Sequence, residues 1–230
     1  MLKNRKFVIT AFVVAIVLIA VVGVAPAVIS AFTGPGVKTE GLTDEYAKPA
    51  EVSLDGEWEV VRNRGDNATS VGFTFPELLP GDRRVTSGST QQITGGVRVE
   101  DEKLVDGTVT VDMNTIESDN ERRDINVRNK IFETDTYPTS EFRVTEPADL
   151  SGVPDDGTAG EVELTGELTI HGVTREVTAP VKVLRDRDRV VVSATIPVNR
   201  LDYEVETPDF VAATIDEQGE INIRLTLRQP

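Results

Sequence analysis

The sequence of 230 residues contains no cysteine and a single histidine, His171. Without cysteine the chain forms no disulfide, no thiolate nucleophile and no cysteine-ligated metal centre. One histidine also excludes a multi-histidine metal site within one chain. Aromatic residues make up 5% of the chain and do not cluster at strand ends, which argues against a barrel that itself spans an outer membrane. We therefore expect no metal site and no cofactor.

Basic residues are few relative to acidic ones. The chain has 24 Lys and Arg against 39 Asp and Glu, which gives a formal net charge of −15. A nucleic acid or an anionic lipid surface would have to approach such a chain through a repulsive field. Hydrophobic residues reach 39%, which is too high for a wholly disordered chain. We expect a folded domain with no nucleic-acid partner.

Signatures of catalysis are also missing. The sequence has no glycine-rich phosphate loop, no nucleophile elbow and no helical metal-binding motif. A catalytic pair of carboxylates could come from any of the 39 acidic residues, but no spacing in the sequence identifies two of them as such a pair. The sequence therefore predicts a protein that is not an enzyme.

A long apolar stretch lies near the N-terminus. No charged residue occurs between Phe7 and Val37, and residues 7–32 are dominated by Val, Ala, Ile, Leu and Phe. Such a stretch is long enough to span a bilayer. Residues 1–6 are basic and the chain after the stretch is acidic, so the positive-inside rule places residues 1–6 in the cytoplasm. We expect a single-pass cell-membrane protein with its remaining residues outside.

A cleaved signal peptide is the alternative for the same stretch. Small residues at 25–27 and 29–31 offer sites for a peptidase. The apolar stretch is longer than the roughly 7 to 15 residues of a usual signal core, which favours an uncleaved anchor. Cleavage would make the protein secreted, and both interpretations export the rest of the chain. Residues 33–53, with glycines, prolines and mixed charges but no period, are expected to form a flexible linker.

Residues 54–230 show a hydrophobic period of two, which is typical of strands with one buried face. The clearest example is the stretch 162–170. Further strands are predicted at 71–75, 105–113, 173–183, 190–198 and 221–227, and weaker ones at 58–61, 93–99 and 140–144. Turn signals at Asp106-Gly107, His171-Gly172 and Gln218-Gly219 separate them. Eight or nine such strands predict an all-β antiparallel barrel or sandwich.

One segment breaks this period. Asp119 or Asn120 suits the N-cap of a short helix over residues 121–128. Ile125 and Phe132 fall on one side of this helix. We expect the helix to lie across one end of the barrel, with these two side chains closing that end. The sequence leaves open whether the helix is a fixed lid or a gate for a ligand.

Two motifs in the middle of the chain resemble the YceI family. The first begins with Ile116-Glu117-Ser118 and Arg123-Asp124-Ile125, and continues through the sequence IFETDTYPTSEF at residues 131–142. The second is LTGELTIHGVTR at residues 164–175. Looser similarities at 56–60, 70–73 and 199–203 extend the resemblance over residues 54–227.

The resemblance implies an eight-stranded, lipocalin-like antiparallel barrel with one short helix, preceded here by a single transmembrane helix. It also implies an apolar cavity that holds an isoprenoid lipid, such as a quinone or a polyprenyl phosphate, or another long-chain amphiphile. No catalysis is implied. The sequence thus predicts a membrane-tethered, extracytoplasmic binding protein with its YceI-like barrel at residues 54–230. The alternative is a solid barrel whose acidic surface recruits a protein partner, and a homodimer also remains open.

Twelve residues are expected to line the cavity, with the core of a solid barrel as the alternative role: Trp58, Phe73, Phe75, Val109, Val111, Ile125, Phe132, Phe142, Leu164, Leu168, Ile170 and Ala194. Small inward residues would widen an eight-stranded barrel and large ones would fill it. Five further residues are candidates for contact with a lipid headgroup: Arg122, Arg123, Arg128, His171 and Arg200. Guanidinium groups suit bidentate contact with phosphate. The alternatives are ion pairs of these arginines with Asp124 or Asp202, and a turn role for His171.

Overall fold

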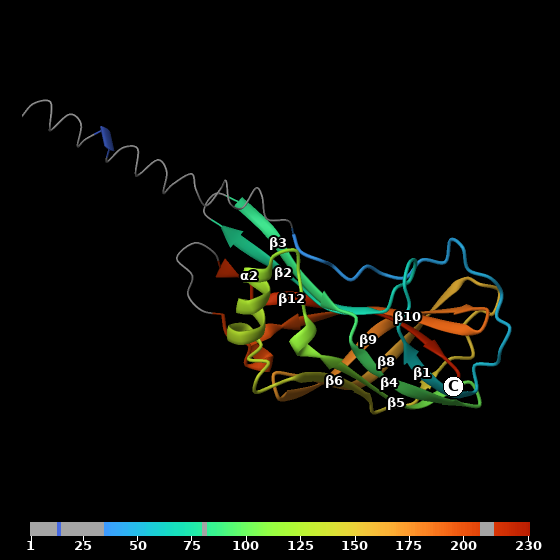
Figure 1. The fold of residues 1–230 in the computed structure, drawn as a ribbon. Helices are drawn as coiled ribbons and strands as arrows, with labels where there is room; N and C mark the ends of the chain where they lie inside the picture. Colours follow the sequence, from blue (N-terminus) through green and yellow to red (C-terminus); the bar gives the residue numbers. More distant parts are fainter. Residues whose placement is uncertain (1–12, 15–34, 80–81, 208–213) are drawn as a thin grey trace, which may run out of the picture.

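The computed structural model describes residues 13–14, 35–79, 82–207 and 214–230 (Figure 1). The expected cytoplasmic tail and nearly all of the expected anchor lie outside these residues. Within the described part of the chain, no helix is both long and apolar enough to cross a membrane.

Eight antiparallel strands close into a barrel, because the last strand pairs with the first. Their order around the barrel is β1-β4-β5-β6-β8-β9-β10-β12. Their bounds are β1 Gly56–Val61, β4 Ile93–Glu100, β5 Lys103–Asp112, β6 Thr139–Val144, β8 Ala159–Ile170, β9 Val173–Asp186, β10 Arg189–Asn199 and β12 Gln218–Arg228. The all-β fold and the eight-stranded antiparallel barrel predicted from the sequence are confirmed.

A hairpin of β2 (Ser70–Leu79) and β3 (Asp82–Thr90) extends the sheet beyond the barrel. The sequence did not predict β3, because the buried residues of this strand are polar. The Ser87 hydroxyl lies 3.0 Å from that of Thr74, and the Thr90 hydroxyl lies 2.6 Å from that of Thr115. Buried hydroxyl groups are tolerated when they pair in this way. Two short strands, β7 (Ala148–Asp149) and β11 (Thr214–Ile215), complete the sheet.

Two of the expected turns lie inside strands instead. Gly107 falls within β5, where a Cβ atom would lie 2.9 Å from the side chain of Val97. Gly219 falls within β12, where a Cβ atom would lie 2.3 Å from the ring of Phe75. Both glycines therefore make room for a side chain on another strand. The prediction of turns at Asp106-Gly107 and Gln218-Gly219 is wrong, because these glycines serve packing within the sheet.

The predicted short helix is present as α2 (Glu121–Asn126). The side chain of Asn120 caps it by accepting from the amides of Arg122 and Arg123 at 3.0 and 3.2 Å. The chain then continues as a π-helical turn, η2 (Val127–Ile131). Two 3-10 turns, η1 (Met113–Thr115) and η3 (Arg200–Tyr203), lie at the ends of β5 and β10.

Residues 35–53 form a strap along the outside of the barrel (Figure 1). Gly36 forms a parallel bridge with Ser87 of β3, and Ala50 forms one with Arg187 between β9 and β10. Midway, the amide of Thr43 donates to the Asn67 side chain at 2.8 Å. The expectation of a flexible linker is therefore wrong for these residues, because backbone hydrogen bonds hold them against the barrel.

Asp186 fixes the far end of the strap to the barrel. Its buried carboxylate accepts from the Lys48 amide at 3.0 Å and from Arg189 Nε at 2.9 Å. Burial alone raises the pKa of Asp186, but these hydrogen bonds outweigh burial and hold the pKa below its ordinary value. A carboxyl group with a lowered folded-state pKa stabilises the fold above its unfolded pKa, and this stabilisation is lost as the pH falls through the folded pKa.

We expect Asp186→Asn to lower the free energy of unfolding at pH 7 by about 1.5–3 kcal/mol, the range for hydrogen bonds to charged groups. The difference from the native chain should shrink once the pH falls below about 3.9, the unfolded pKa of aspartate. Urea unfolding of residues 35–230, which contain the whole barrel, measures both effects. Asp188→Asn, at an exposed carboxylate, is the matched control and should change stability little. An equal loss for Asp186→Asn at pH 7 and pH 2 would refute this account.

Candidate functional site

The barrel encloses a cavity of about 190 Å³. All eight barrel strands contribute side chains to its lining, which is almost wholly apolar. Among the described lining residues, only Ser140, Glu141 and Ser193 have polar side chains. An engineered cavity of about 150 Å³ lined by Leu, Ile and Phe stays dry and binds benzene, so a cavity of this kind suits an apolar ligand. The barrel is therefore hollow in the part of the chain that the structure describes, whereas the alternative raised from the sequence was a barrel filled by its own side chains.

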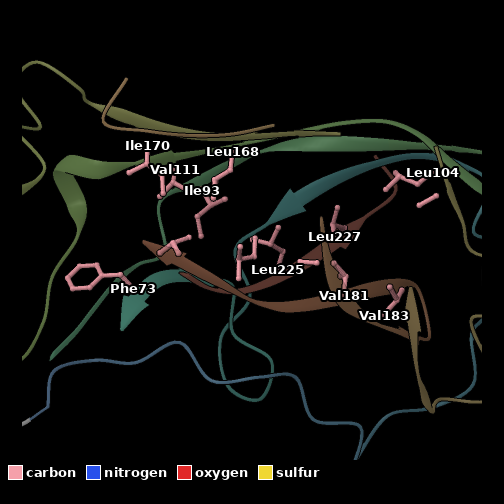
Figure 2. Packing of buried hydrophobic residues seen from close by; sticks show 14 of the residues in the cluster. Phe73, Ile93, Leu104, Val111, Leu168, Ile170, Val181, Val183, Leu225 and Leu227 are labelled. Carbon is pink, nitrogen blue, oxygen red and sulfur yellow. The ribbon is translucent and has the colours of Figure 1, made fainter. Parts of the chain in front are cut away.

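Large side chains close one end of the cavity. Trp58 is only 2% exposed, and its indole Nε1 donates to the carbonyl of Leu54 at 2.7 Å. Leu104 and Leu150, also buried, line the cavity beside it. Figure 2 shows the apolar side chains along the barrel, from Leu104 at this end to Phe73 at the other.

Aromatic rings close the opposite end. The Phe73 and Phe132 ring centroids are 5.5 Å apart, and those of Phe73 and Phe75 are 6.2 Å apart. A second cavity of about 50 Å³ lies beside these rings and is lined by residues of β2, η2, η3 and β11. Phe73, Phe132, Ile170 and Ile221 line both cavities. A few side chains therefore separate the main cavity from the end at which α2 and η2 lie.

Ten of the twelve predicted lining residues line the main cavity: Trp58, Phe73, Val109, Val111, Phe132, Phe142, Leu164, Leu168, Ile170 and Ala194. Phe75 instead lines the second cavity. Nine of these ten residues lie on strands, where alternation places their side chains because every second residue of a strand faces the same side. Phe132, which follows η2, was instead predicted from the short helix.

The prediction for Ile125 is wrong. Its side chain is 46% exposed and lines neither cavity. The prediction assumed that one regular helix carries Ile125 and Phe132 on the same face. The π-helical turn η2 contains an extra residue, which changes the rotation between these positions. Val127 and Ile131 line the second cavity in place of Ile125.

Three of the arginine candidates hold nearby chain segments in place. Arg128 Nη1 donates to the Ile116 carbonyl at 2.7 Å, and Arg200 Nη1 donates to the Val205 carbonyl at 2.8 Å. Arg123 pairs with Asp119, rather than with the expected Asp124.

The arginines also differ in their position relative to the cavities. Of the four candidates, Arg200 lines the second cavity and the other three line neither. Arg122 is exposed on α2. Arg200 is therefore the candidate best placed to meet a headgroup at the α2 end.

His171 lies in the predicted turn, between β8 and β9. It has a φ of +52° and the following Gly172 has +75°, as two-residue hairpin turns require. Its Nε2 atom is buried without a hydrogen-bond partner and lies 4.0 Å from the carboxylate of Glu133. The ring packs against Tyr137 at 4.2 Å between centroids. His171 lines neither cavity, so its position does not favour a role at the headgroup.

Ser140 is a site residue that the sequence reasoning missed. It lines the main cavity, and its hydroxyl oxygen is buried without a hydrogen-bond partner. The signal was present in the strand pattern, because Ser140 shares its side of β6 with Phe142 and Val144. A buried polar atom without a partner costs free energy, which a ligand oxygen at this position would recover.

Comparison with known proteins adds a family and a fold. A family model described as YceI-like domain matches residues 64–227. The chain is similar to a polyisoprenoid binding domain from Saccharophagus degradans implicated in plant cell wall breakdown, with 17% identity, a TM-score of 0.59, and coverage of 75% of this chain and 98% of that one. It is also similar to BcnA from Burkholderia cenocepacia, with 20% identity, a TM-score of 0.53, and coverage of 67% and 95%. No curated protein matches the chain.

Proposed function

Because this chain belongs to the YceI family, whose model matches residues 64–227, we propose that its barrel binds the chain of an isoprenoid lipid in the apolar cavity. The ligand is a quinone, a polyprenyl phosphate or a similar long-chain amphiphile. The observation that carries the proposal is the hollow barrel with its apolar lining. The Saccharophagus degradans neighbour, described as a polyisoprenoid binding domain, supports the choice of ligand class. The role is binding and presentation of the lipid, without catalysis.

The proposal includes tethering on the outer side of a membrane. The apolar stretch 7–32 and the change from basic to acidic residues across it support this location. The acidic surface then keeps the domain soluble beside its membrane.

The energetics of the cavity show where selectivity arises. Each methylene buried from water contributes about 0.8 kcal/mol, so several isoprene units would be held tightly relative to water. Relative to a bilayer the transfer is nearly neutral, because lipid tails are as apolar as the cavity. Selectivity between lipids therefore comes from the shape of the cavity and from its few polar contacts, such as the Ser140 hydroxyl.

The fluorescence of Trp58 tests the proposal. Trp58 is the only tryptophan of the chain and lines the cavity. Titration of residues 35–230 with an isoprenoid quinone should quench its emission saturably, at one equivalent. A polyprenyl phosphate should reverse the quenching by competition, and the quinone headgroup without its tail should not saturate. Equal, unsaturable quenching by the tailed and tailless quinones would contradict binding in the cavity.

Ser140→Ala tests whether the Ser140 hydroxyl forms a hydrogen bond with a ligand oxygen, separately from the packing of the isoprenoid chain in the cavity. One net hydrogen bond of about 0.5–1.5 kcal/mol corresponds to about a 2- to 12-fold change in Kd. We therefore expect weaker binding of a quinone by about fivefold, and unchanged binding of squalene, an isoprenoid hydrocarbon without oxygen. Competition against Trp58 quenching measures both affinities. If the substitution weakens the binding of both ligands equally, or of neither, Ser140 makes no hydrogen bond to the quinone.

A further inference from the structure

Exposed apolar side chains gather at the α2 end of the barrel. The described residues expose eight large hydrophobic side chains: Val13, Val14, Val37, Tyr46, Leu78, Val85, Ile125 and Leu201. Four of these, Leu78, Val85, Ile125 and Leu201, belong to the elements β2, β3, α2 and η3, and we call them the rim. They are between 43% and 53% exposed.

The elements of the rim lie next to the second cavity. Phe75 of β2, Thr86 of β3 and Tyr203 of η3 line this cavity, as does Val127, the residue that follows α2. Each rim element therefore has a residue on the cavity or next to it. Figure 1 shows α2 and the ends of β2 and β3 together at the end of the barrel opposite the C-terminus.

The strap begins on the side of the barrel where the rim lies. Ser87 of β3 donates its amide to the Pro35 carbonyl at 2.8 Å, and Gly36 bridges Ser87 in parallel. Since β3 runs away from the rim, the parallel strap also runs away from it, and Pro35 is the rim end of the described strap. The apolar stretch ends at Phe32 in the sequence, and three residues span at most about 11 Å.

The charge of the rim segments differs from that of the whole chain. The rim segments β2, β3, α2 and η3 together contain five basic and five acidic residues, whereas the chain carries a net charge of −15. These segments therefore lack the repulsion that keeps the rest of the domain away from lipid headgroups. An apolar rim that carries no net negative charge suits a lipid surface.

We infer that the rim docks on the bilayer that holds residues 7–32, so that the second cavity and the Phe73–Phe132 rings face the lipid. This inference rests on the proposed function, because it assigns the route by which the lipid reaches the cavity. The ligand passes from the membrane between the rim elements and past the aromatic rings, without crossing water. The strap fixes this orientation by holding the chain after the apolar stretch against β3.

The absence of cysteine allows a direct test with single labels. Val85→Cys places a label on the rim, and Asp188→Cys places one in the turn between β9 and β10, beside the far end of the strap. Each full-length variant carries an environment-sensitive fluorophore and is reconstituted into phosphatidylcholine vesicles that contain doxyl-labelled lipids. We expect at least twofold quenching of the Val85→Cys label and none of the Asp188→Cys label. Equal quenching of both labels, stronger quenching at Asp188→Cys, or none at Val85→Cys would overturn the inference.

A rim variant gives a second measurement. Leu78→Ser, Ile125→Ser and Leu201→Ser combined with Val85→Cys should lose most of the label's quenching, because the docking side chains are gone. Unchanged quenching in this variant would overturn the role of the rim.

Quinone titration followed by Trp58 fluorescence, on the same samples in detergent, separates this inference from the proposed function. If the quinone binds saturably but the Val85→Cys label is not quenched, the docking inference is refuted and the proposed lipid-binding function stands. Quenching at the rim without saturable binding would instead refute the lipid-binding function.

Discussion

Ala194→Phe should abolish lipid binding while the barrel remains folded. Ala194 lines the main cavity from β10, where it is in register with Val181 and Ile223. A phenylalanine ring at this position would occupy a large part of a cavity of about 190 Å³. The isoprenoid chain could no longer extend along the barrel, and we expect Kd to rise by at least a factor of about 100, or 2.7 kcal/mol.

The effect on stability should be much smaller. Overpacking costs about 1–3 kcal/mol in a filled core, but here the ring enters a hollow space and buries apolar surface. We therefore expect the free energy of unfolding to change by less than about 1 kcal/mol. Thr195→Phe is the matched control, because the next residue of β10 is exposed. If Ala194→Phe still binds the lipid tightly, or if Ala194→Phe and Thr195→Phe lose affinity for the lipid equally, the ligand does not occupy this cavity.

Trp58→Ala should destabilise the barrel more than any other substitution considered. Trp58 is 2% exposed, closes one end of the cavity and donates to the Leu54 carbonyl. Truncation of a buried tryptophan costs about 3–5 kcal/mol, a large part of the roughly 5–15 kcal/mol of a typical domain. Circular dichroism during urea unfolding measures this loss without relying on the missing fluorophore.

Trp58→Phe separates packing from hydrogen bonding at the same position. It keeps an aromatic ring but leaves the Leu54 carbonyl without its indole donor. Loss of one buried partner costs about 1–3 kcal/mol, so this variant should lie between the native chain and Trp58→Ala. A loss below about 1 kcal/mol for Trp58→Ala would mean that the end of the barrel is not sealed by this side chain.

The sequence was sufficient to predict most of the barrel, because hydrophobic alternation and strand geometry carry the same information. It placed Leu168 and Ile170 on the cavity side of one strand without any knowledge of the neighbouring strands. The strand β3 could not be found in this way, since its buried residues, such as Ser87 and Thr90, are polar. Their burial depends on hydroxyl partners from other parts of the chain, which a local pattern does not show.

Two further features depend on contacts that are distant in the sequence. The strap has the composition of a linker, and it is held by partners such as Ser87 and Arg187 that lie far along the chain. The exposure of Ile125 depends on the change from α-helical to π-helical geometry after α2. The arginine candidates were chosen for their chemistry, but Arg128 uses its guanidinium group to hold the backbone of Ile116.

The most direct test of lipid binding is native mass spectrometry of the full chain, extracted from host membranes in mild detergent. The account predicts a stoichiometric adduct that is lost in organic solvent and whose extract fragments as an isoprenoid. The Ala194→Phe variant prepared in parallel should lack the adduct. A mass without adduct for the native chain, still unchanged after incubation with quinones and polyprenyl phosphates, would contradict the central claim that this barrel is a lipid-binding site.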